Sequence, residues 1–460
     1  METRVVGRVV TLAALAASIL VGATASAQTQ GAVPGPGATV KCESQPGQRQ
    51  VCLATTSAGV TIARETGAVN CVLGQTWNYD ATSVWVQDGC AGEFALGDKE
   101  EPFLGNLTTT GQLMAQGAFY EDEAELQDSL SFIDFAFSTG DKIKLFARWE
   151  WGVNFIRGGT QFNAGATTTG GFLTLDQVDA PLFGNRLGYV GVDFGAAGRV
   201  TVGKQNAVHY DVASYTTDRW NVFGGQGSIA YPAGTDGGTL GVGRVDQAVS
   251  YRVTALRILE LGGQLQFRNA TNSDLVDGYG VSAQVTVLPG LKLGGAYTET
   301  YFSQEVKDAV PGLQGASEYG ILGASYSSEF LDLGAVWATQ RNGDAVRLPT
   351  TDLPDAPGIV PVVFDGDGVE LYARANLGRF SVLGGFVDYA PDHDDSRVDP
   401  DFRVRYFILG GEASLRKNAY AYAEWRIDDD SLNAQGNEGF SVFTIGLRYG
   451  FAVKGLHGQF

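Results

Sequence analysis

Large apolar residues alternate with small or polar ones along residues 442–451, near the end of the chain. On an extended segment, such alternation places one set of side chains on each face. The bulky face holds Phe443, Ile445, Leu447, Tyr449 and Phe451, and the other face holds threonine, glycine and arginine. A face of aliphatic and aromatic residues opposed by small and polar ones is typical of a strand between lipid and water.

The same alternation returns from about residue 106 to residue 451 and predicts about sixteen strands. Counts of fourteen or eighteen stay open, and an even number brings both ends of the strand array to the same side. The predicted strands cover residues 107–119, 128–139, 141–155, 186–194, 198–205, 246–253, 258–268, 277–287, 290–300, 317–327, 330–340, 367–376, 379–389, 402–415, 418–427 and 439–451.

Two kinds of connection alternate between these strands. Tight turns are predicted at residues 139–141, 289–290, 329–330, 378–379 and 416–418, and long polar loops at residues 156–185, 206–245, 301–316, 341–366, 390–401 and 428–438. Short turns on one rim and long loops on the other are typical of an all-β, antiparallel transmembrane barrel. We expect Trp149, Trp151, Tyr420 and Tyr422 in the aromatic girdles at the membrane surfaces.

The first 27 residues are predicted to be a signal peptide, because two arginines precede a short apolar run, residues 9–21, and Ala25-Ser26-Ala27 is a small-residue cleavage pattern. The run is shorter than the ~20 residues of a membrane-anchoring helix, which is the alternative. Residues 28–40 are rich in Gly, Pro, Ala and Gln and are predicted to be a linker. No later stretch approaches 18 uninterrupted apolar residues, so we expect no transmembrane helix.

All four cysteines of the chain, Cys42, Cys52, Cys71 and Cys90, lie within a short segment after the linker. An even number of cysteines in an exported chain predicts two disulfides, with three possible pairings that the sequence does not distinguish. A zinc site is less favoured, because there is no C-x-x-C pair and no nearby histidine. The segment predicts a small domain over residues 41–95.

This segment resembles a four-cysteine domain of unknown function found in exported bacterial proteins. The matching residues are Cys71, Gly74, Trp77, Tyr79, Asp80, Trp85, Gly89, Cys90 and Phe94. Trp77 and Trp85 have the chemistry to stack against a sugar, but we expect both in the core, because a domain this small needs its aromatic residues there.

The formal net charge of the chain is −19. Nucleic-acid binding is therefore not expected, because phosphate contacts need clustered lysines and arginines. Acidic residues concentrate in the predicted loops, as in residues 392–395 and 428–430. Most belong to solvated loops, but they also favour cations near the mouth of a channel or divalent ions that bridge to anionic lipid headgroups. We expect no cofactor and no resident metal.

Two further runs make the barrel segment recognisable. Residues 186–191, Arg-Leu-Gly-Tyr-Val-Gly, and residues 198–205, Gly-Arg-Val-Thr-Val-Gly-Lys-Gln, resemble the fourth and fifth strands of Gram-negative general diffusion porins. The resemblance spans roughly residues 106–451 and implies a sixteen-stranded barrel in the outer membrane, a homotrimer, and lipid and lipopolysaccharide as partners. It also implies that the third loop, residues 206–245, folds into the barrel, and that the closing strand with Tyr449 and Phe451 is an assembly signal, followed by a tail at residues 452–460.

In this family, acids on the third loop face basic residues on the opposite wall, at the narrowest point of the pore. The resemblance assigns Lys204 and Arg244 to basic wall positions and Asp218 to an acidic loop position; Asp211 lies in the same loop. Arg148 and Glu150 are expected to point inward if Trp149 and Trp151 point outward. Three other family positions lack the expected charge and fall on Gln112, Ser129 and Val222.

The sequence therefore predicts a porin that forms a passive, water-filled channel for ions and small hydrophilic solutes, with a mild preference for cations. One alternative is a channel specific for sugar or phosphate, and Trp220 and Tyr231 in the third loop leave the sugar version open. A second alternative is a binding or structural protein that acts through the cysteine-rich domain, placed in the periplasm and touching peptidoglycan or another partner.

An enzyme is not expected. The three histidines, His209, His393 and His457, all lie in predicted loops or in the tail, and no serine-centred motif accompanies them. No phosphate-binding loop is present to couple transport to an energy source.

Overall fold

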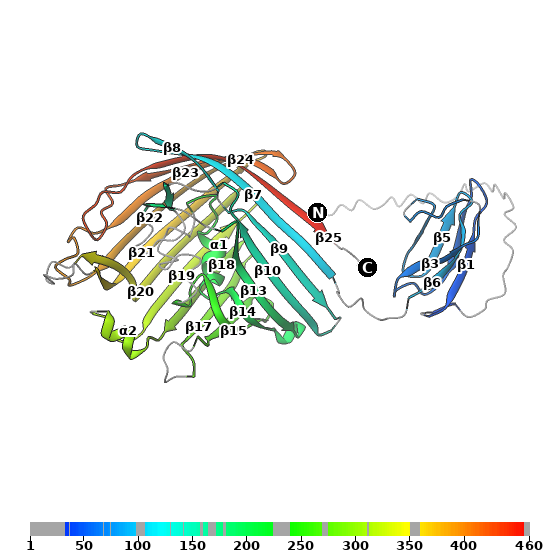
Figure 1. Cartoon of the computed structure of the whole chain (residues 1–460), viewed down its shortest axis with the longest axis horizontal. Helices are drawn as coiled ribbons and strands as arrows, with labels where there is room; N and C mark the ends of the chain where they lie inside the picture. The colour runs from blue at the N-terminus through cyan, green and yellow to red at the C-terminus, as the bar shows by residue number, and fades with distance from the viewer. Residues whose placement is uncertain are drawn as a thin grey trace, which may run out of the picture. The chain divides into compact units, whose positions relative to one another are not determined.

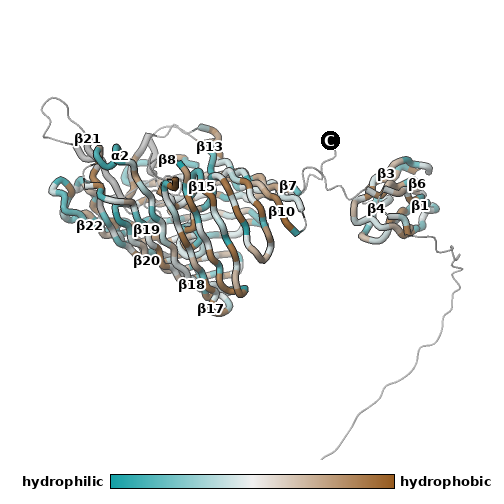
Figure 2. Tube along the Cα trace, turned by 90° about the horizontal axis from the view of Figure 1, so that it is seen from below, coloured by the Kyte–Doolittle hydropathy of each residue, from teal (hydrophilic) through white to brown (hydrophobic). Residues whose placement is uncertain are grey.

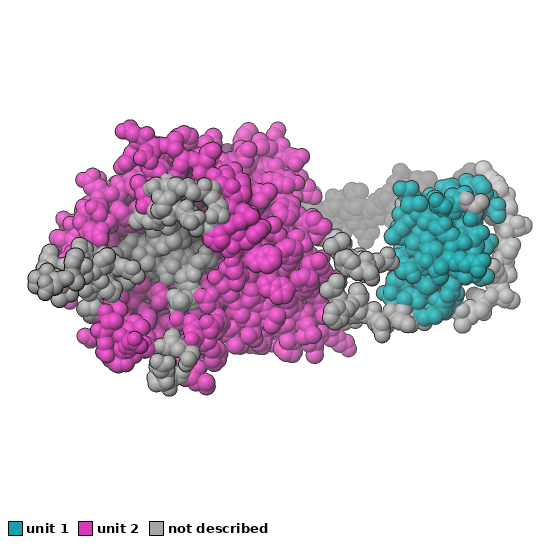
Figure 3. Space-filling view, in the orientation of Figure 1, with its two compact units in different colours: residues 1–101 teal, residues 102–460 magenta. Residues whose placement is uncertain are grey.

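The structure is a computed structural model with two compact units, Met1–Glu101 and Pro102–Phe460, each of which is described by itself (Figure 3). The predicted signal peptide and the first part of the predicted linker lie outside the described residues. The described residues run from residue 33 to residue 454, with gaps at 36, 68, 74, 98–105, 129, 141, 157–159, 164–171, 178–180, 224–239, 269–274, 311 and 350–358.

The second unit is a closed antiparallel barrel in which each strand pairs with the next and the last pairs with the first (Figure 1). Seventeen strands form the ring, but β8 and β9 both pair along β7 and are two halves of one interrupted strand, which leaves sixteen. The prediction of a sixteen-stranded barrel is therefore confirmed. The strands are β7 Asn106–Tyr120, β8 Glu123–Asp128, β9 Phe132–Thr139, β10 Lys144–Val153, β13 Phe183–Asp193, β14 Arg199–Asn206, β15 Arg244–Ala255, β16 Leu259–Gln266, β17 Gly278–Leu288, β18 Leu291–Thr300, β19 Ser317–Ser327, β20 Leu331–Pro349, β21 Ile359–Leu377, β22 Phe380–Asp392, β23 Val404–Arg416, β24 Ala419–Asp428 and β25 Val442–Lys454.

One predicted loop is wrong. Much of the connection at residues 341–366 is a hairpin extension of β20 and β21, paired from Asp344↔Phe364 to Pro349↔Ile359. Val346 and Leu348 continue the alternation on one side, and residues 359–364 are a β-prone run of valine and isoleucine on the other, across a register shift after Gln340. Two other long connections contain short elements: β11 Thr160–Asn163 pairs with β12 Thr174–Gln177, and α2 covers Gln304–Ala309.

The outer face of the barrel is apolar, as the alternation predicts. On β25, Phe443, Ile445, Leu447 and Tyr449 are exposed, while Thr444 between them is buried. Figure 2 shows apolar residues recurring along the barrel strands. No helix among the described residues is long and apolar enough to cross a membrane.

The outer-face position that a girdle residue needs is found on one of the two strands and not on the other. Trp149 and Trp151 are exposed on the outer face of β10. Tyr422 is buried and its hydroxyl donates to Gln116 Oε1 at 3.0 Å, so it points into the barrel. The physical reason is strand parity, because Trp425 on the same strand takes the outer face and leaves the even-numbered positions inside.

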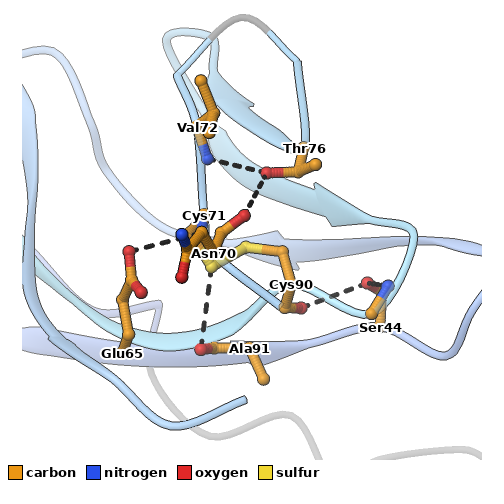
Figure 4. Close-up of a disulfide and its surroundings, with 9 residues drawn as sticks. Ser44, Glu65, Asn70, Cys71, Val72, Thr76, Cys90 and Ala91 are labelled. Atoms are coloured by element: carbon orange, nitrogen blue, oxygen red, sulfur yellow. Dashed lines mark hydrogen bonds between the residues drawn. A yellow bond between two sulfur atoms is a disulfide. The ribbon is translucent and has the colours of Figure 1, made fainter. Parts of the chain in front are cut away.

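The first unit contains two three-stranded antiparallel sheets. Their orders are β1-β6-β3 and β2-β5-β4, with bounds β1 Thr39–Glu43, β2 Arg49–Leu53, β3 Val60–Glu65, β4 Trp77–Tyr79, β5 Ser83–Gln87 and β6 Ala91–Leu96. The two predicted disulfides are present and pair Cys42 with Cys52 and Cys71 with Cys90. Around the second bridge, Ser44 Oγ donates to the Cys90 carbonyl at 3.1 Å (Figure 4).

The two tryptophans of this unit differ in position. Trp77 is buried against Phe94, with ring centroids 5.0 Å apart, as predicted for a core residue. Trp85 is only partly buried, because it lies on the outer face of its sheet, between Val84 and Val86, which are both in the core. The prediction that Trp85 belongs to the core is wrong.

The third loop of the barrel runs along its inner wall. Its helix α1, Tyr210–Thr216, lies inside the ring of strands and contacts β17, β18, β19 and β20 (Figure 1). Glycines on successive strands make room for it: a Cβ atom there would collide with side chains or backbone of the loop. These glycines are Gly262, Gly280, Gly294, Gly323, Gly334 and Gly385. Together they form a glycine track that seats the loop.

A charged residue on the outer face should destabilise the barrel according to its depth. Leu322, midway along β19, is 58% exposed, and Val453, at the end of β25, is 57% exposed. We expect Leu322→Arg to lower the free energy of unfolding by about 2 to 4 kcal/mol, and Val453→Arg by about 0 to 1 kcal/mol. Reversible unfolding from lipid vesicles measures both, and equal losses would contradict an outer face in contact with hydrocarbon.

The glycine track predicts unequal effects at two adjacent residues of β22. A Cβ at Gly385 would collide with the indole ring of Trp220, whereas a Cβ at Gly384 meets nothing within 4 Å. We expect Gly385→Ala to displace the loop and change single-channel conductance, and Gly384→Ala to leave it unchanged. Identical conductance in both variants would contradict the seating of the loop.

Candidate functional site

The described part of the third loop follows the inner wall from β16 to β24. Near its start, the backbone N–H of Val208 donates to Gln264 Oε1 on β16 at 2.8 Å. Farther along, Thr217 Oγ1 donates to Glu370 Oε2 on β21 at 2.6 Å. It then reaches β24, so the segment between residues 207 and 223 narrows the channel that a sixteen-stranded barrel would otherwise leave wide.

The carboxylate of Glu424 holds the backbone at the far end of this described segment, and Glu412 accepts the Asn221 side-chain amide at 2.8 Å. Glu424 on β24 is buried and accepts the backbone N–H groups of Asn221, Val222 and Phe223, at 2.6, 2.8 and 3.3 Å. Both carboxylate oxygens accept hydrogen bonds, so the three backbone contacts together anchor this end of the segment. Arg448 on β25 adds a bond to Asn221 Oδ1 at 2.7 Å.

The wall formed by β9, β10 and β13 carries a connected group of charges. Arg148 Nε donates to Asp134 Oδ1 at 2.7 Å, and its Nη2 donates to Glu150 Oε2 at 3.0 Å. Arg186 Nε donates to the other oxygen of Glu150 at 2.7 Å. The structure thus brings Arg148 and Glu150, two of the predicted site residues, into one network.

Arg186 and Asp134 belong to this network but were not predicted as site residues. A β-bulge between β10 and β13 pairs Glu150 with Leu187 and Trp151 with Asn185, which leaves Arg186 as the extra residue, turned toward Glu150. The alternation of residues on β9 could have indicated that Asp134 points inward. The direction of Arg186 depends on the bulge, which leaves no comparable signal in the sequence.

Asp218 and Arg244 lie near each other, around Tyr210. The charges of Asp218, Arg244 and Arg186 all act on the Tyr210 hydroxyl, so these side chains share one region of the lumen. Burial raises the pKa of Tyr210, and Asp218 adds to the shift in the same direction. Arg244 is itself buried, where β15 begins after the loop.

Asp211 lies against the wall. Arg252 Nε donates to its Oδ2 at 2.9 Å, and Ser282 Oγ donates to the same oxygen at 3.1 Å. The carboxylate is therefore largely compensated by the wall of β15 and β17. A cavity of ≈ 550 Å³ lies beside it toward the rim of short turns, lined among others by Arg199, Glu260 and Lys292.

Lys204 does not belong to the lumen. Thr201 and Gln205 of β14 are buried and joined by a side-chain hydrogen bond inside the barrel, and Val202 is exposed on the outside. Alternation then places Lys204 outside as well, where its Nζ donates to the carbonyl of Asn185 at 3.1 Å. The prediction of Lys204 as a constriction residue is wrong, because strand parity decides its face.

The remaining family positions lie as follows. Gln112 donates from Nε2 to the carbonyl of Leu130 at 2.6 Å, Ser129 is outside the described residues, and Val222 is buried at the loop anchor. Tyr449 is exposed on the outer face of β25, and the Phe451 ring covers Gly111 on β7.

In most of the lumen ion pairs, the basic side chain is closer to water than its acidic partner. The Arg148 side chain is 33% exposed and that of Asp134 9%; for Arg448 and Glu412 the values are 27% and 4%. Lys292 with Glu260 is an exception, with the acid more exposed. A passing solute therefore meets guanidinium groups that are backed by recessed carboxylates.

One of the three histidines lies inside the barrel, in the third loop. His209 is buried at the start of α1. Within the described part of the chain, no group of three or more His, Cys, Asp or Glu side chains is placed to hold a metal ion.

The anchor at Glu424 predicts a specific defect. Glu424→Gln replaces one acceptor oxygen with an NH2 donor, which leaves at least one of these buried backbone N–H groups without an acceptor and costs roughly 1 to 3 kcal/mol. We expect flickering single-channel currents, because the loop end moves more freely. Glu299→Gln, which removes a carboxylate bound to Tyr279 at the rim of long loops, is the matched control. Steady currents in Glu424→Gln would contradict the anchor.

Comparison with known proteins agrees with this geometry. Residues 100–452 match the family described as Gram-negative porin, and residues 22–115 match a protein family of unknown function, DUF3011. Outer membrane porin F of Xenorhabdus nematophila is 26% identical over 330 residues, which cover 68% of this chain and 81% of that protein.

Two solved structures share the fold. OmpF of Salmonella typhi, in complex with daunomycin, has a TM-score of 0.56 at 17% identity and covers 75% of this chain and 97% of its own. OmpT of Vibrio cholerae, in its trimer form, has a TM-score of 0.50 at 16% identity, with 75% and 99% covered.

The family match covers the whole barrel, and its members form channels and are not enzymes. The chain belongs to the Gram-negative porin family and is an outer-membrane β-barrel with an additional disulfide-bonded N-terminal domain.

Proposed function

We propose that the protein is a passive, water-filled channel for ions and small hydrophilic solutes. The observation that carries this proposal is a loop fixed along the inner wall from β16 to β24, while β9, β10 and β13 carry paired charges. Such a constriction orients water, so an apolar solute would have to disrupt the ordered layer, while polar solutes exchange one set of polar contacts for another.

We further propose that the predicted mild preference for cations arises outside the constriction. Several lumen arginines are paired with acids, as at Asp134, Glu150 and Glu412, and these pairs contribute little net charge. The net charge of −19 is concentrated in the loops, where Arg397 holds the pKa of Asp395 at about 2. Such a carboxylate stays ionised at physiological pH and favours cations near the mouth.

Planar-bilayer recordings in a salt gradient test both statements. We expect ohmic conductance, and a reversal potential whose sign shows that cations are more permeable than anions. Neutralising Asp392, Asp394 and Asp395 together should lower the cation-to-anion permeability ratio by roughly twofold. The control neutralises Glu43, Glu65 and Glu93 in the N-terminal unit, which removes the same number of charges. No conductance would refute the channel, and strong anion selectivity would refute the preference.

A channel specific for sugars is less well supported. Trp220, the aromatic residue that kept this alternative open, is buried against Tyr372, with ring centroids 5.1 Å apart, and is committed to seating the loop. Tyr231 lies outside the described residues. A phosphate channel would need unpaired lysines and arginines, whereas Arg374 and Arg448 share Glu412.

We propose the following surroundings. The apolar outer face contacts outer-membrane lipid and lipopolysaccharide, and three copies assemble, as the trimer form of OmpT suggests. The N-terminal domain lies in the periplasm: β7 and β25 meet through Thr108↔Lys454 at the rim of short turns, where the first unit joins the barrel. In outer-membrane barrels, short turns face the periplasm. We keep Tyr449 and Phe451 as the proposed assembly signal.

A further inference from the structure

The two sheets of the N-terminal domain have different outer faces. On the β1-β6-β3 sheet, Lys41 and Glu93 pair across strands at 3.0 Å, as is usual for a sheet face in water. On the β2-β5-β4 sheet, Val51 is 50% exposed and Leu53 65% exposed, and Trp85 lies between β2 and β4. Apolar side chains gathered on one exposed sheet face indicate a binding surface.

Trp85 lies at the centre of this surface. In the register of the sheet, Val51 is opposite Trp85 on one side and Asn78 is opposite it on the other. The Arg49 guanidinium lies 3.9 Å from the centroid of the Trp85 ring, a cation–π contact that limits the rotation of the indole. The ring is thus held in place on the surface and does not contribute to the core.

Polar groups that suit a neutral, hydroxylated ligand surround the ring. Gln87, two residues along β5 from Trp85, donates from Nε2 to the carbonyl of Gln75 at 2.9 Å, which fixes the orientation of its amide. Asn78 Oδ1 accepts the backbone N–H of Tyr79 at 2.9 Å, and its amide nitrogen remains a donor group. Arg49 adds guanidinium donors over one face of the ring, which leaves the other face for a ligand.

This combination matches the chemistry of a sugar. The C–H face of a pyranose packs on an indole, while its hydroxyl and N-acetyl groups hydrogen-bond to amides and guanidinium groups. A protein partner of standard size would need a larger apolar area than Val51, Leu53 and Trp85 provide. The surface around Trp85 is formed with Arg49, Val51, Asn78 and Gln87. Arg49 is the single charged side chain among these five, which disfavours a highly charged ligand.

We propose that the face formed by Arg49, Val51, Asn78, Trp85 and Gln87 binds the N-acetylated glycan strands of peptidoglycan, with Trp85 stacked on a sugar ring. This inference rests on the proposed periplasmic location of the domain.

Co-sedimentation of the full-length, detergent-solubilised protein with purified peptidoglycan sacculi tests this proposal. We expect the wild-type protein to sediment, and Trp85→Ala to lower the apparent affinity at least tenfold. Trp85→Phe should keep most of the binding, because it retains an aromatic face. Thr61→Ala, on β3 of the other sheet, is the matched control and should bind like the wild type.

Soluble competitors identify the part of the polymer that is bound. Tetra-N-acetylchitotetraose should displace the protein from sacculi, and the free stem peptide should not. The proposal is overturned if the wild type fails to sediment, if Trp85→Ala binds as well as wild type, or if only the stem peptide competes. Non-reducing electrophoresis of each variant checks that both disulfides are intact, so that loss of binding is not loss of fold.

Conductance of the same preparations separates this proposal from the channel function. A variant with normal conductance and no sacculus binding would support the surface and leave the channel proposal standing. Absent conductance together with Trp85-dependent binding would refute the channel alone.

Discussion

The constraint on which this structure depends is that every backbone N–H and C=O in the hydrocarbon layer needs a partner within the protein. A strand array meets it only by closing on itself, and here the pairing of β25 with β7 removes the last free edge. Closure then fixes the faces of all strands, because alternation sends one set of side chains to lipid and the other to the lumen. The apolar exterior and the charged interior are two results of the same closure.

A barrel closed in this way is too wide to be selective, so a narrower opening requires material from a loop. The third loop supplies it, and the wall is shaped to receive it. Glycines on β16 to β22 bring its helix and the following residues against the strands, and Glu424 holds its end through backbone N–H groups. The wall strands that carry the loop therefore have small residues beneath it. Strands β9, β10 and β13, which do not carry the loop, keep their arginines and acids.

How far the sequence predicts this arrangement depends on whether the cause is local. The two-residue period is a local property of each strand, and it was enough to predict sixteen strands, their faces and the inward direction of Arg148 and Glu150. It also would have placed Lys204 outside, beside Val202, had parity been given more weight than resemblance to a family position. Arg186 was missed because its direction comes from a bulge, where neighbouring strands fall out of step. Likewise, the disulfide pairing and the outward position of Trp85 depend on how two sheets of the small domain pack, which no spacing along the chain encodes.

The charged residues of the lumen and those of the loops differ in how far they are paired. In the lumen, recessed acids neutralise arginines that remain near water, so the constriction is strongly polar without a large net charge. Such a wall can orient water across the opening while imposing little preference for either sign of ion. The excess of acids must then act at the loops, where screening by salt limits its range to about 8 to 10 Å. Under the proposed function, a channel built this way excludes apolar solutes through its interior and biases the entry of ions through its exterior, and the two properties can vary independently.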